Sequence, residues 1–255
     1  MSELVAAGFA DGVLRVTLSR PEKRNALSDA LIAAIGAVFA EWRTREDLSL
    51  AVLTGAGDKA FASGGDLKEL EALRDEEEAC AFASRTRAAF DRIRRFPVPV
   101  LAILNGDALG GGAELAMACD HRVALSHARI GFLQAKLNIA TAWGGGTDLF
   151  TLAGPSRAVR ILATAQIFSA AEAQSLGLVD AVAPAGAEAG SFVEDYIAGM
   201  KQRPQVMRAI KSLAIMHRFG GSPEERASRE TRAFAAAWIH DDHWAAVAKM
   251  AAAKR

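Results

Sequence analysis

The chain is poor in cysteine and carries no excess charge. Its 255 residues include 2 cysteines, and 30 Lys plus Arg balance 30 Asp plus Glu. Cys80 and Cys119 lie in alanine-rich stretches without C-x-x-C spacing. We therefore expect buried free thiols in a reducing compartment, and neither a disulfide nor a zinc site. The balanced charge gives no reason to expect a nucleic acid or an anionic membrane as a partner.

Long hydrophobic runs are also missing. No window has the apolar length of a membrane span. The N-terminal stretch MSELVAAGFADG lacks the basic and apolar regions of a secretory signal. We therefore expect a cytoplasmic protein. With 51% hydrophobic and 24% charged residues, the composition is typical of a globular chain that is long enough for one large core, with or without a smaller appendage.

Strand and helix patterns alternate along most of the chain. Apolar alternation on both sides of Asp11-Gly12 predicts a β-hairpin. Ser28 is the predicted N-cap of a helix over 28–43, where apolar residues recur at helical spacing. Apolar runs at 48–55 and 100–106 predict two buried strands.

The last quarter of the chain differs from the rest. From about Ser191 onward the apolar spacing is helical only, whereas the segment before it still includes predicted strands at 121–126 and 178–183. We therefore expect an α/β core over residues 1–190 and an all-helical region over 191–255. The recurring order of strand, strand and helix in the core is compatible with a structural repeat that the sequence no longer shows.

Two glycine-rich loops follow the predicted buried strands. The first contains Ser63-Gly64-Gly65, and the second, LGGGAELAMACD at 109–120, places three glycines before a helical run. Glycine disfavours a helix, so three of them suggest that something other than protein approaches the backbone. Unpaired N–H groups from two such loops can stabilise an oxygen that becomes negative during a reaction. The alternative, that the glycines only permit tight turns or close packing, stays open from the residues alone.

Two other kinds of ligand are disfavoured. GAGDKA at 55–60 fits a loose dinucleotide-binding pattern, but that motif must open directly into a helix, and FASGGD follows here. His240 and His243 have a spacing that can hold a metal. Isolated histidines of this kind beside aspartates usually belong to a solvated helix end, so we expect no metal site.

Several stretches together resemble one known family. KAFASGGDLKEL (59–70) and NGDALGGGAELAMACD (105–120) are similar to the paired signature of the crotonase, or enoyl-CoA hydratase/isomerase, superfamily. LSRPEKRNALS (18–28) resembles the N-terminal CoA-binding stretch of that family, and ILATAQIFSAAEAQSLGLVDAV (161–182) resembles a later landmark. The likeness runs in order from about residue 12 to residue 200.

The resemblance implies a spiral of β-β-α turns, assembled as a homotrimer or a dimer of trimers. It implies an acyl-CoA thioester as substrate and no cofactor besides the coenzyme A of that substrate. The backbone amides of Gly65 and Gly111 would form an oxyanion hole for an enolate. Lys23 and Arg24 would contact the CoA phosphates, although alone they more often form a solvated turn. Further substrate-binding positions implied by the family are Ala26, Ser63, Gly64, Asp66 and Leu67.

The sequence offers one of the two carboxylates that hydratases of this family use. The first glutamate matches Glu114, at a helix start where the dipole also favours an acid. The second falls on Gln134, and an amide neither gives nor takes a proton near neutral pH, although it can orient a water. Leu133 and Asn138 also depart from the family pattern. Trp143 is expected either as a wall close to the acyl group or as an aromatic plug in the core.

A lone carboxylate fits decarboxylation of a malonyl-type CoA thioester better than hydration. Carbon dioxide leaves, the amides hold the enolate oxygen, and Glu114 protonates the carbon. The F-x6-I-x3-W-G-G arrangement at 132–145 and RETRAFAAAW at 229–238 resemble the methylmalonyl/ethylmalonyl-CoA decarboxylase-like branch. Enoyl-CoA hydration or double-bond isomerisation is the alternative. A non-catalytic CoA-binding scaffold is a second alternative, which the retained Glu114 and glycine loops disfavour.

Overall fold

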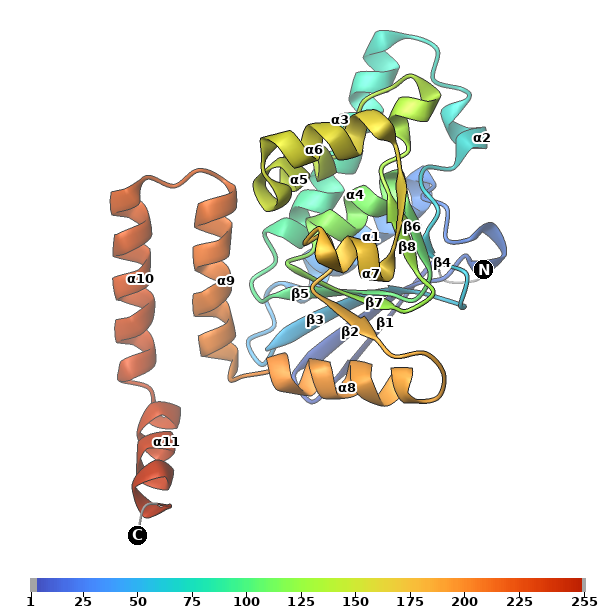
Figure 1. The fold of residues 1–255 in the computed structure, drawn as a ribbon. Helices are drawn as coiled ribbons and strands as arrows, with labels where there is room; N and C mark the ends of the chain where they lie inside the picture. Colours follow the sequence, from blue (N-terminus) through green and yellow to red (C-terminus); the bar gives the residue numbers. More distant parts are fainter. Residues whose placement is uncertain (1–3, 254–255) are drawn as a thin grey trace.

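In the larger of two β-sheets, the strands lie side by side in the order of the chain. The computed structural model describes residues 4–253, and its six-stranded sheet runs β1-β2-β3-β5-β7-β10 (Figure 1). β1 and β2 form the predicted antiparallel hairpin, and every other neighbouring pair is parallel. The strands are β1 Val5–Ala10, β2 Val13–Leu18, β3 Leu50–Gly55, β5 Val100–Leu104, β7 His121–Leu125 and β10 Ala181–Ala183.

The second sheet consists of very short strands and runs β4-β6-β8-β9. These strands are β4 Ala60–Ala62, β6 Asp107–Leu109, β8 Arg129–Gly131 and β9 Ile167–Ser169. β4, β6 and β8 are parallel, and each follows one strand of the larger sheet along the chain. Three successive turns therefore place one strand in each sheet, namely β3 and β4, β5 and β6, and β7 and β8. This is the repeat of strand, strand and helix that the sequence suggested.

Helices complete each turn of the chain. Ser28 caps α1 by accepting a hydrogen bond from the Leu31 amide, as predicted. The charged segment that follows the first glycine-rich loop forms two helices, α2 and α3. The helices up to β10 are α1 Asp29–Trp42, α2 Leu67–Leu70, α3 Glu76–Arg94, α4 Gly111–Ala118, α5 Gly145–Ala153, α6 Pro155–Thr164 and α7 Ala170–Ser175, with 3₁₀ turns at Pro21–Lys23 and Gln134–Leu137.

After β10 the described chain is helical only. Its helices are α8 Glu188–Met200, α9 Pro204–Arg218, α10 Pro223–Trp238 and α11 Asp241–Ala252. α10 and α11, here called the C-terminal arm (residues 223–252), lie at the side of the molecule, with α9 between α10 and the core (Figure 1). The arm exposes large apolar side chains: Phe234, Trp238, Ile239, Trp244 and Met250. None of the helices in residues 4–253 is both long and apolar enough to cross a bilayer.

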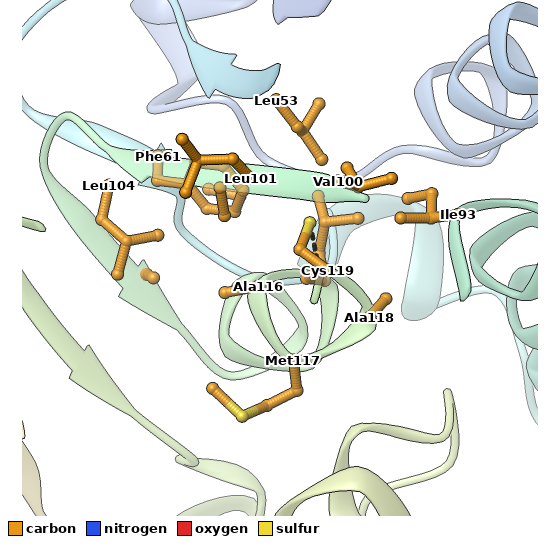
Figure 2. Close-up of a cluster of buried hydrophobic side chains, with 14 of the residues drawn as sticks. Leu53, Phe61, Ile93, Val100, Leu101, Leu104, Ala116, Met117, Ala118 and Cys119 are labelled. Carbon is orange, nitrogen blue, oxygen red and sulfur yellow. Dashed lines mark hydrogen bonds between the residues drawn. The ribbon is translucent and has the colours of Figure 1, made fainter. Parts of the chain in front are cut away.

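Helix α4, which begins at the triple glycine, lies inside the core. All of its residues are buried, and Figure 2 shows Ala116 and Met117 in one apolar cluster with Val100 and Leu101 of β5. Cys119 follows α4 and is a buried free thiol, as predicted. Burial raises the pKa of Cys119 to about 12, so it stays a neutral, apolar packing group.

The burial predicted for Cys80 is wrong. Cys80 is a free thiol but is exposed, and it lies in the N-terminal half of α3, where residues 76–80 are all exposed. Its alanine neighbours suggested burial, but alanine is a strong helix former on solvent-facing positions as well.

Lys211 connects helix α9 to the core through a buried ion pair. Its Nζ lies 2.6 and 2.5 Å from the two carboxylate oxygens of Asp120, and its side chain is 1% exposed. Burial lowers the pKa of Lys211, and Asp120 acts in the opposite direction. Asp120 also accepts a hydrogen bond from the Val100 amide at the start of β5.

We predict that Lys211→Ala lowers the free energy of unfolding by about 3 kcal/mol, because it leaves the Asp120 carboxylate without its cation. Denaturant unfolding followed by circular dichroism measures the change. Lys249→Ala, on an exposed position of α11, is the matched control and is expected to have an effect within about 0.5 kcal/mol. Equal effects of the two variants would contradict the prediction.

Candidate active site

The two glycine loops lie side by side at one edge of the second sheet. Ser63-Gly64-Gly65 follows β4, Gly110 precedes α4 directly after β6, and these two strands are paired. A Cβ placed on Gly64 would lie 3.1 Å from the Leu109 carbonyl oxygen and 3.6 Å from the Gly111 amide nitrogen. The absence of a side chain at Gly64, which has φ +107°, thus favours this close approach of the two loops.

Both of the predicted amide donors are free among residues 4–253. Leu27 donates a hydrogen bond to the Gly64 carbonyl and accepts one from the Asp66 amide, and neither of these bonds uses the Gly65 N–H. Gly111 begins α4, and its N–H is one of the amides that have no partner within a helix. The second loop therefore presents its donor at the positive end of α4. Two unpaired N–H groups are thus available at the same edge of the fold.

These loops open into a large cavity, which has a volume of about 830 Å³. Every site residue predicted from the sequence lines this cavity, except Arg24. Arg24 lies beside a separate hollow of about 230 Å³, with Pro21 and Lys59. The cationic side chains that line the large cavity are Lys23, Lys68 and Lys136.

Glu114 is the buried carboxylate of this cavity. It lies in the first turn of α4, is 2% exposed, and accepts three hydrogen bonds. The Trp143 and Gly145 amides donate to Oε2 at 2.9 and 3.0 Å, and the side-chain amide of Gln134 donates to Oε1 at 2.9 Å. Burial raises the pKa of Glu114 above its ordinary value, and these hydrogen bonds act in the opposite direction.

Gln134 faces Glu114 from the 3₁₀ turn that follows β8. Its Nε2 makes the hydrogen bond to the carboxylate, whereas its Oε1 is buried and has no partner among the described residues. A buried carbonyl oxygen without a donor costs free energy, so it is a place where a bound molecule or a water can donate a hydrogen bond.

The Trp143 indole lines the cavity and packs against two phenylalanines of the core. It is 7% exposed and makes edge-to-face contacts with Phe82 and Phe90, at ring-centroid distances of 5.8 and 5.9 Å. On its other side the ring lies against both glycine loops: a Cβ on Gly65 would be 3.3 Å from the indole, and one on Gly111 only 1.9 Å. The apolar wall therefore ends directly beside the two free amides.

Arg20 belongs to the site and was not predicted. Its guanidinium donates to the Ala26 carbonyl at 2.7 Å and pairs with Asp66 at 3.1 Å, which links the N-terminal segment to the first glycine loop. The negative charge of Asp66 is therefore balanced by Arg20 at the edge of the cavity. The sequence carried one weak signal, since Arg20 directly precedes Pro21 in the stretch that resembles a CoA-binding motif.

Segment 55–60 and His240 have other structural roles. Segment 55–60 leads from β3 into strand β4, so it lacks the helix that a dinucleotide-binding loop requires. His240 is the N-cap of α11 and accepts a hydrogen bond from the Asp242 amide. Within residues 4–253 no group of three or more His, Cys, Asp or Glu side chains is arranged to hold a metal ion.

Comparison with known proteins agrees with the geometry. A family model described as enoyl-CoA hydratase/isomerase matches residues 8–249. A short-chain-enoyl-CoA hydratase of Clostridium acetobutylicum is 37% identical over 167 residues, which is 66% of this chain and 64% of that protein. An ethylmalonyl-CoA decarboxylase of Bos taurus is 30% identical over 206 residues, which is 78% of this chain and 66% of that protein. The aligned chain thus spans slightly less than two thirds of either relative.

A solved structure matches over a greater length. The crystal structure of an enoyl-CoA hydratase from Bacillus anthracis superposes with a TM-score of 0.87 and 30% sequence identity, covering 97% of this chain and 95% of that one. The match includes the C-terminal helices as well as the two sheets.

Proposed function

The chain belongs to the enoyl-CoA hydratase/isomerase family, the crotonase superfamily, and has its fold; from this we propose that it is an enzyme that stabilises the enolate of an acyl-CoA thioester. The observation that carries the proposal is the pair of unpaired amides at Gly65 and Gly111 beside the buried Glu114. Two such donors stabilise negative charge on a thioester oxygen, and one of them is typically worth about 3 kcal/mol in a transition state.

Decarboxylation of a malonyl-type CoA thioester is the reaction we prefer. The bond between the α-carbon and the carboxylate breaks, its electron pair enters the thioester as an enolate, and carbon dioxide leaves. The proton of the Glu114 carboxyl then passes to the α-carbon, and solvent restores it. Burial of Glu114 favours the protonated form that this step requires. The apolar wall of Trp143 also favours the loss of charge when carboxylate becomes carbon dioxide.

Enoyl-CoA hydration or double-bond isomerisation is the second candidate. It is favoured by the hydratase names of relatives such as the Clostridium acetobutylicum protein. It is also favoured by the free Oε1 of Gln134, which can accept a hydrogen bond from a water held beside Glu114. Isomerisation needs only one group that moves a proton between two carbons, and Glu114 suffices for that.

Purified protein offered four CoA thioesters separates these reactions. Crotonyl-CoA, a 3-enoyl-CoA, methylmalonyl-CoA and ethylmalonyl-CoA are incubated separately, and the products are measured by mass spectrometry. We expect loss of carbon dioxide from a malonyl-type substrate to be fastest. A predominant gain of water would overturn the decarboxylase preference, and binding of every thioester without turnover would support the scaffold alternative.

Binding of the coenzyme A portion is proposed along the first loop. Lys23 is placed to attract the phosphates, together with the other lysines that line the cavity. Arg24 acts from the neighbouring hollow. The residues proposed to line the path of the thioester, all of which line the cavity, are Ala26, Ser63, Gly64, Asp66 and Leu67.

Replacing Gln134 by glutamate is expected to raise hydratase activity with crotonyl-CoA. The change places a second carboxyl group within hydrogen-bond distance of Glu114. One of the two groups can then be protonated while the other is charged, as acid and base of the hydration. We expect an increase of about 10²-fold, the lower end of what general acid–base catalysis contributes. Gln174→Glu, on exposed α7, is the control. Unchanged hydration would mean that residue 134 does not hold the attacking water.

Assembly into a homotrimer or a dimer of trimers is proposed as well. The exposed aromatic and aliphatic side chains of the C-terminal arm support it, because apolar groups gathered on one segment mark a contact with another chain. We also propose a cytoplasmic location, and no cofactor besides the coenzyme A of the substrate.

A further inference from the structure

We propose that Arg94, Asp148 and Arg218 are positioning residues that hold the Glu114 carboxylate in its reactive orientation. They act through the loop of residues 142–145, here called the carboxylate loop. They also act through the C-terminal end of α4 and the first turn of α5. The inference rests on the proposed function insofar as Glu114 is the group that moves the proton. It makes helix α9, from the C-terminal quarter of the chain, part of the frame of the active site.

The carboxylate loop fixes one oxygen of Glu114. The Trp143 and Gly145 amides both donate to Oε2, at 2.9 and 3.0 Å. Gly145 begins α5, so its N–H is available to an acceptor outside the helix. Two donors on one oxygen leave the carboxylate little freedom to rotate. The orientation of Glu114 therefore depends on what holds this loop.

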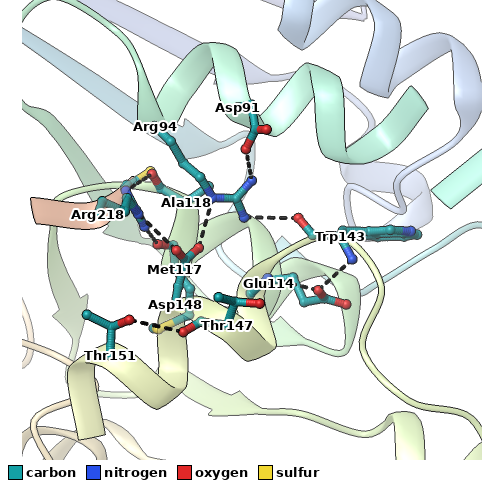
Figure 3. A network of polar contacts seen from close by, with 12 residues as sticks. Asp91, Arg94, Glu114, Met117, Ala118, Trp143, Thr147, Asp148, Thr151 and Arg218 are labelled. Carbon is teal, nitrogen blue, oxygen red and sulfur yellow. Dashed lines mark hydrogen bonds and ion pairs between the residues drawn. The ribbon is translucent and has the colours of Figure 1, made fainter. Parts of the chain in front are cut away.

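Arg94 holds the loop from behind. The side chain is 3% exposed, and all three guanidinium nitrogens donate: Nη2 to the Trp143 carbonyl at 2.9 Å, Nε to Asp148 at 2.9 Å and Nη1 to Asp91 at 2.8 Å (Figure 3). The guanidinium lies so close to the loop that a Cβ on Gly144 would be 2.7 Å from Nη2. Gly144 also has φ +93°, which a side chain disfavours. Arg94 thus binds the peptide unit whose neighbouring N–H binds the catalytic carboxylate.

Arg218 completes the network from helix α9. Its Nε donates to the second oxygen of Asp148 at 2.8 Å, so this carboxylate lies between two guanidinium groups. Its Nη1 and Nη2 donate to the Ala118 and Met117 carbonyls at 3.1 and 2.5 Å (Figure 3). These carbonyls end α4, the helix that carries Glu114 in its first turn, and a cation is favourable there. Arg218 therefore connects the helix of Glu114 to the helix that follows the carboxylate loop.

None of the three residues lines the large cavity, so they act on the substrate only through Glu114. The other titratable groups of the cavity wall are Lys23, Asp66, Lys68 and Lys136. The network itself is balanced in charge, because Asp91 and Asp148 oppose the two arginines. Its effect is therefore one of geometry, exerted on a carboxylate that needs its two amide donors in place.

Arg94→Lys is the direct test. Lysine keeps the charge but has no planar fork, so it cannot reach the Trp143 carbonyl, Asp148 and Asp91 together. We expect kcat for the preferred thioester to fall about 10- to 100-fold, with KM changed by less than about twofold, since a small misplacement of a catalytic group has this effect. Weaker donation from the loop destabilises the charged carboxylate, so the pKa of Glu114 is expected to rise.

Arg122→Lys is the matched control. Arg122 is as deeply buried and donates to Leu178, Asp180 and Cys119, the C-cap of α4, but it contacts neither the carboxylate loop nor Asp148. We expect lower stability with kcat and the pH profile unchanged. An equal loss of kcat in the two variants, after correction for the folded fraction, would show that any buried arginine has this effect and would overturn the proposal.

Arg218→Lys keeps the test decisive if Arg94→Lys does not fold. Its expected change has the same direction as that of Arg94→Lys and is smaller, because it reaches the loop only through Asp148 and α4. A folded Arg218→Lys protein with unchanged kcat and an unchanged Glu114 pKa would overturn the coupling to α9.

A readout without turnover separates this inference from the proposed function. The pKa of Glu114 is measured by ¹³C NMR titration of protein labelled in glutamate carboxyl groups, with Glu114→Gln to assign the signal. A rise in this pKa in Arg94→Lys, but not in Arg122→Lys, supports positioning even if no thioester is turned over. If the wild-type protein turns over a thioester and the pKa of Glu114 does not rise in Arg94→Lys, positioning is refuted and the proposed function is left intact.

Discussion

Glu114→Gln is expected to lower kcat by about 10²- to 10⁴-fold, the range that a positioned proton donor contributes. Binding of the acyl-CoA is expected to persist, because the variant keeps the size of the side chain. The fold is also expected to persist: the new amide can present its oxygen to the Trp143 and Gly145 amides. Gln134 can then turn its unpartnered oxygen toward the new side-chain amide N–H, which keeps a hydrogen bond between the two side chains.

Calorimetric titration with a non-reactive CoA thioester measures the binding, and product formation measures kcat. Glu172→Gln, whose carboxylate only caps the exposed helix α7, is the control for removing a negative charge. Retained turnover in Glu114→Gln would exclude Glu114 as the group that moves the proton.

The same carboxyl gives a pH dependence whose direction identifies the reaction. Decarboxylation requires protonated Glu114, so kcat is expected to fall as pH rises through its pKa. Because burial raises that pKa, the activity extends to higher pH than an ordinary glutamate would allow. Hydration requires the charged form first, so its kcat would instead fall as pH decreases through the same value. Either limb must disappear in Glu114→Gln.

Gly111→Ala is expected to reduce kcat by about 10²- to 10³-fold, because its new methyl group displaces the backbone N–H of residue 111 from the position of an oxyanion donor. The new methyl group would lie 1.9 Å from the Trp143 ring, closer than any real contact. The indole has little room to withdraw, because it packs against Phe82 and Phe90 and its own amide holds Glu114. Overpacking of this kind also destabilises a fold by about 1–3 kcal/mol.

Gly199→Ala is the control for this substitution, because a Cβ there meets nothing within 4 Å and the residue lies within helix α8. It is expected to keep full activity and to gain about 0.5–1 kcal/mol in stability. The double variant Gly111→Ala/Trp143→Ala relieves the steric conflict. Full activity of Gly111→Ala would contradict the predicted displacement of this amide, whereas recovery in the double variant alone would assign the loss to the conflict with the indole.

Sequence patterns predicted the elements that are long enough to have a period. The hairpin at Asp11-Gly12, helix α1 and the buried strands β3 and β5 all agree with their predicted ranges within about two residues. The strands of the second sheet were not predicted, because three residues are too few for any alternation to be visible. These segments are recognised as strands only by their hydrogen bonds to one another in the folded chain.

In the site, too, some residues could be predicted from local sequence patterns and others could not. The free amides lie in loops marked by runs of glycine, and Glu114 follows directly, so these positions were visible in the sequence. Arg94, Asp148 and Arg218 were not, because their partners lie 54 and 70 residues apart and a charged side chain in a helix usually faces water. Only the three-dimensional arrangement shows that Arg94 is buried, that Asp148 and Arg218 are partly buried, and that the three charges pair with one another.

The order of strands in the larger sheet has a consequence for biosynthesis. Since β1, β2, β3, β5, β7 and β10 are neighbours in the order in which they are translated, each new strand finds its pairing edge already formed when it leaves the ribosome. The sheet can therefore grow from one side during translation, without waiting for a distant segment. The final strand has only three residues, so the finished edge offers little unpaired backbone to which another nascent chain could add.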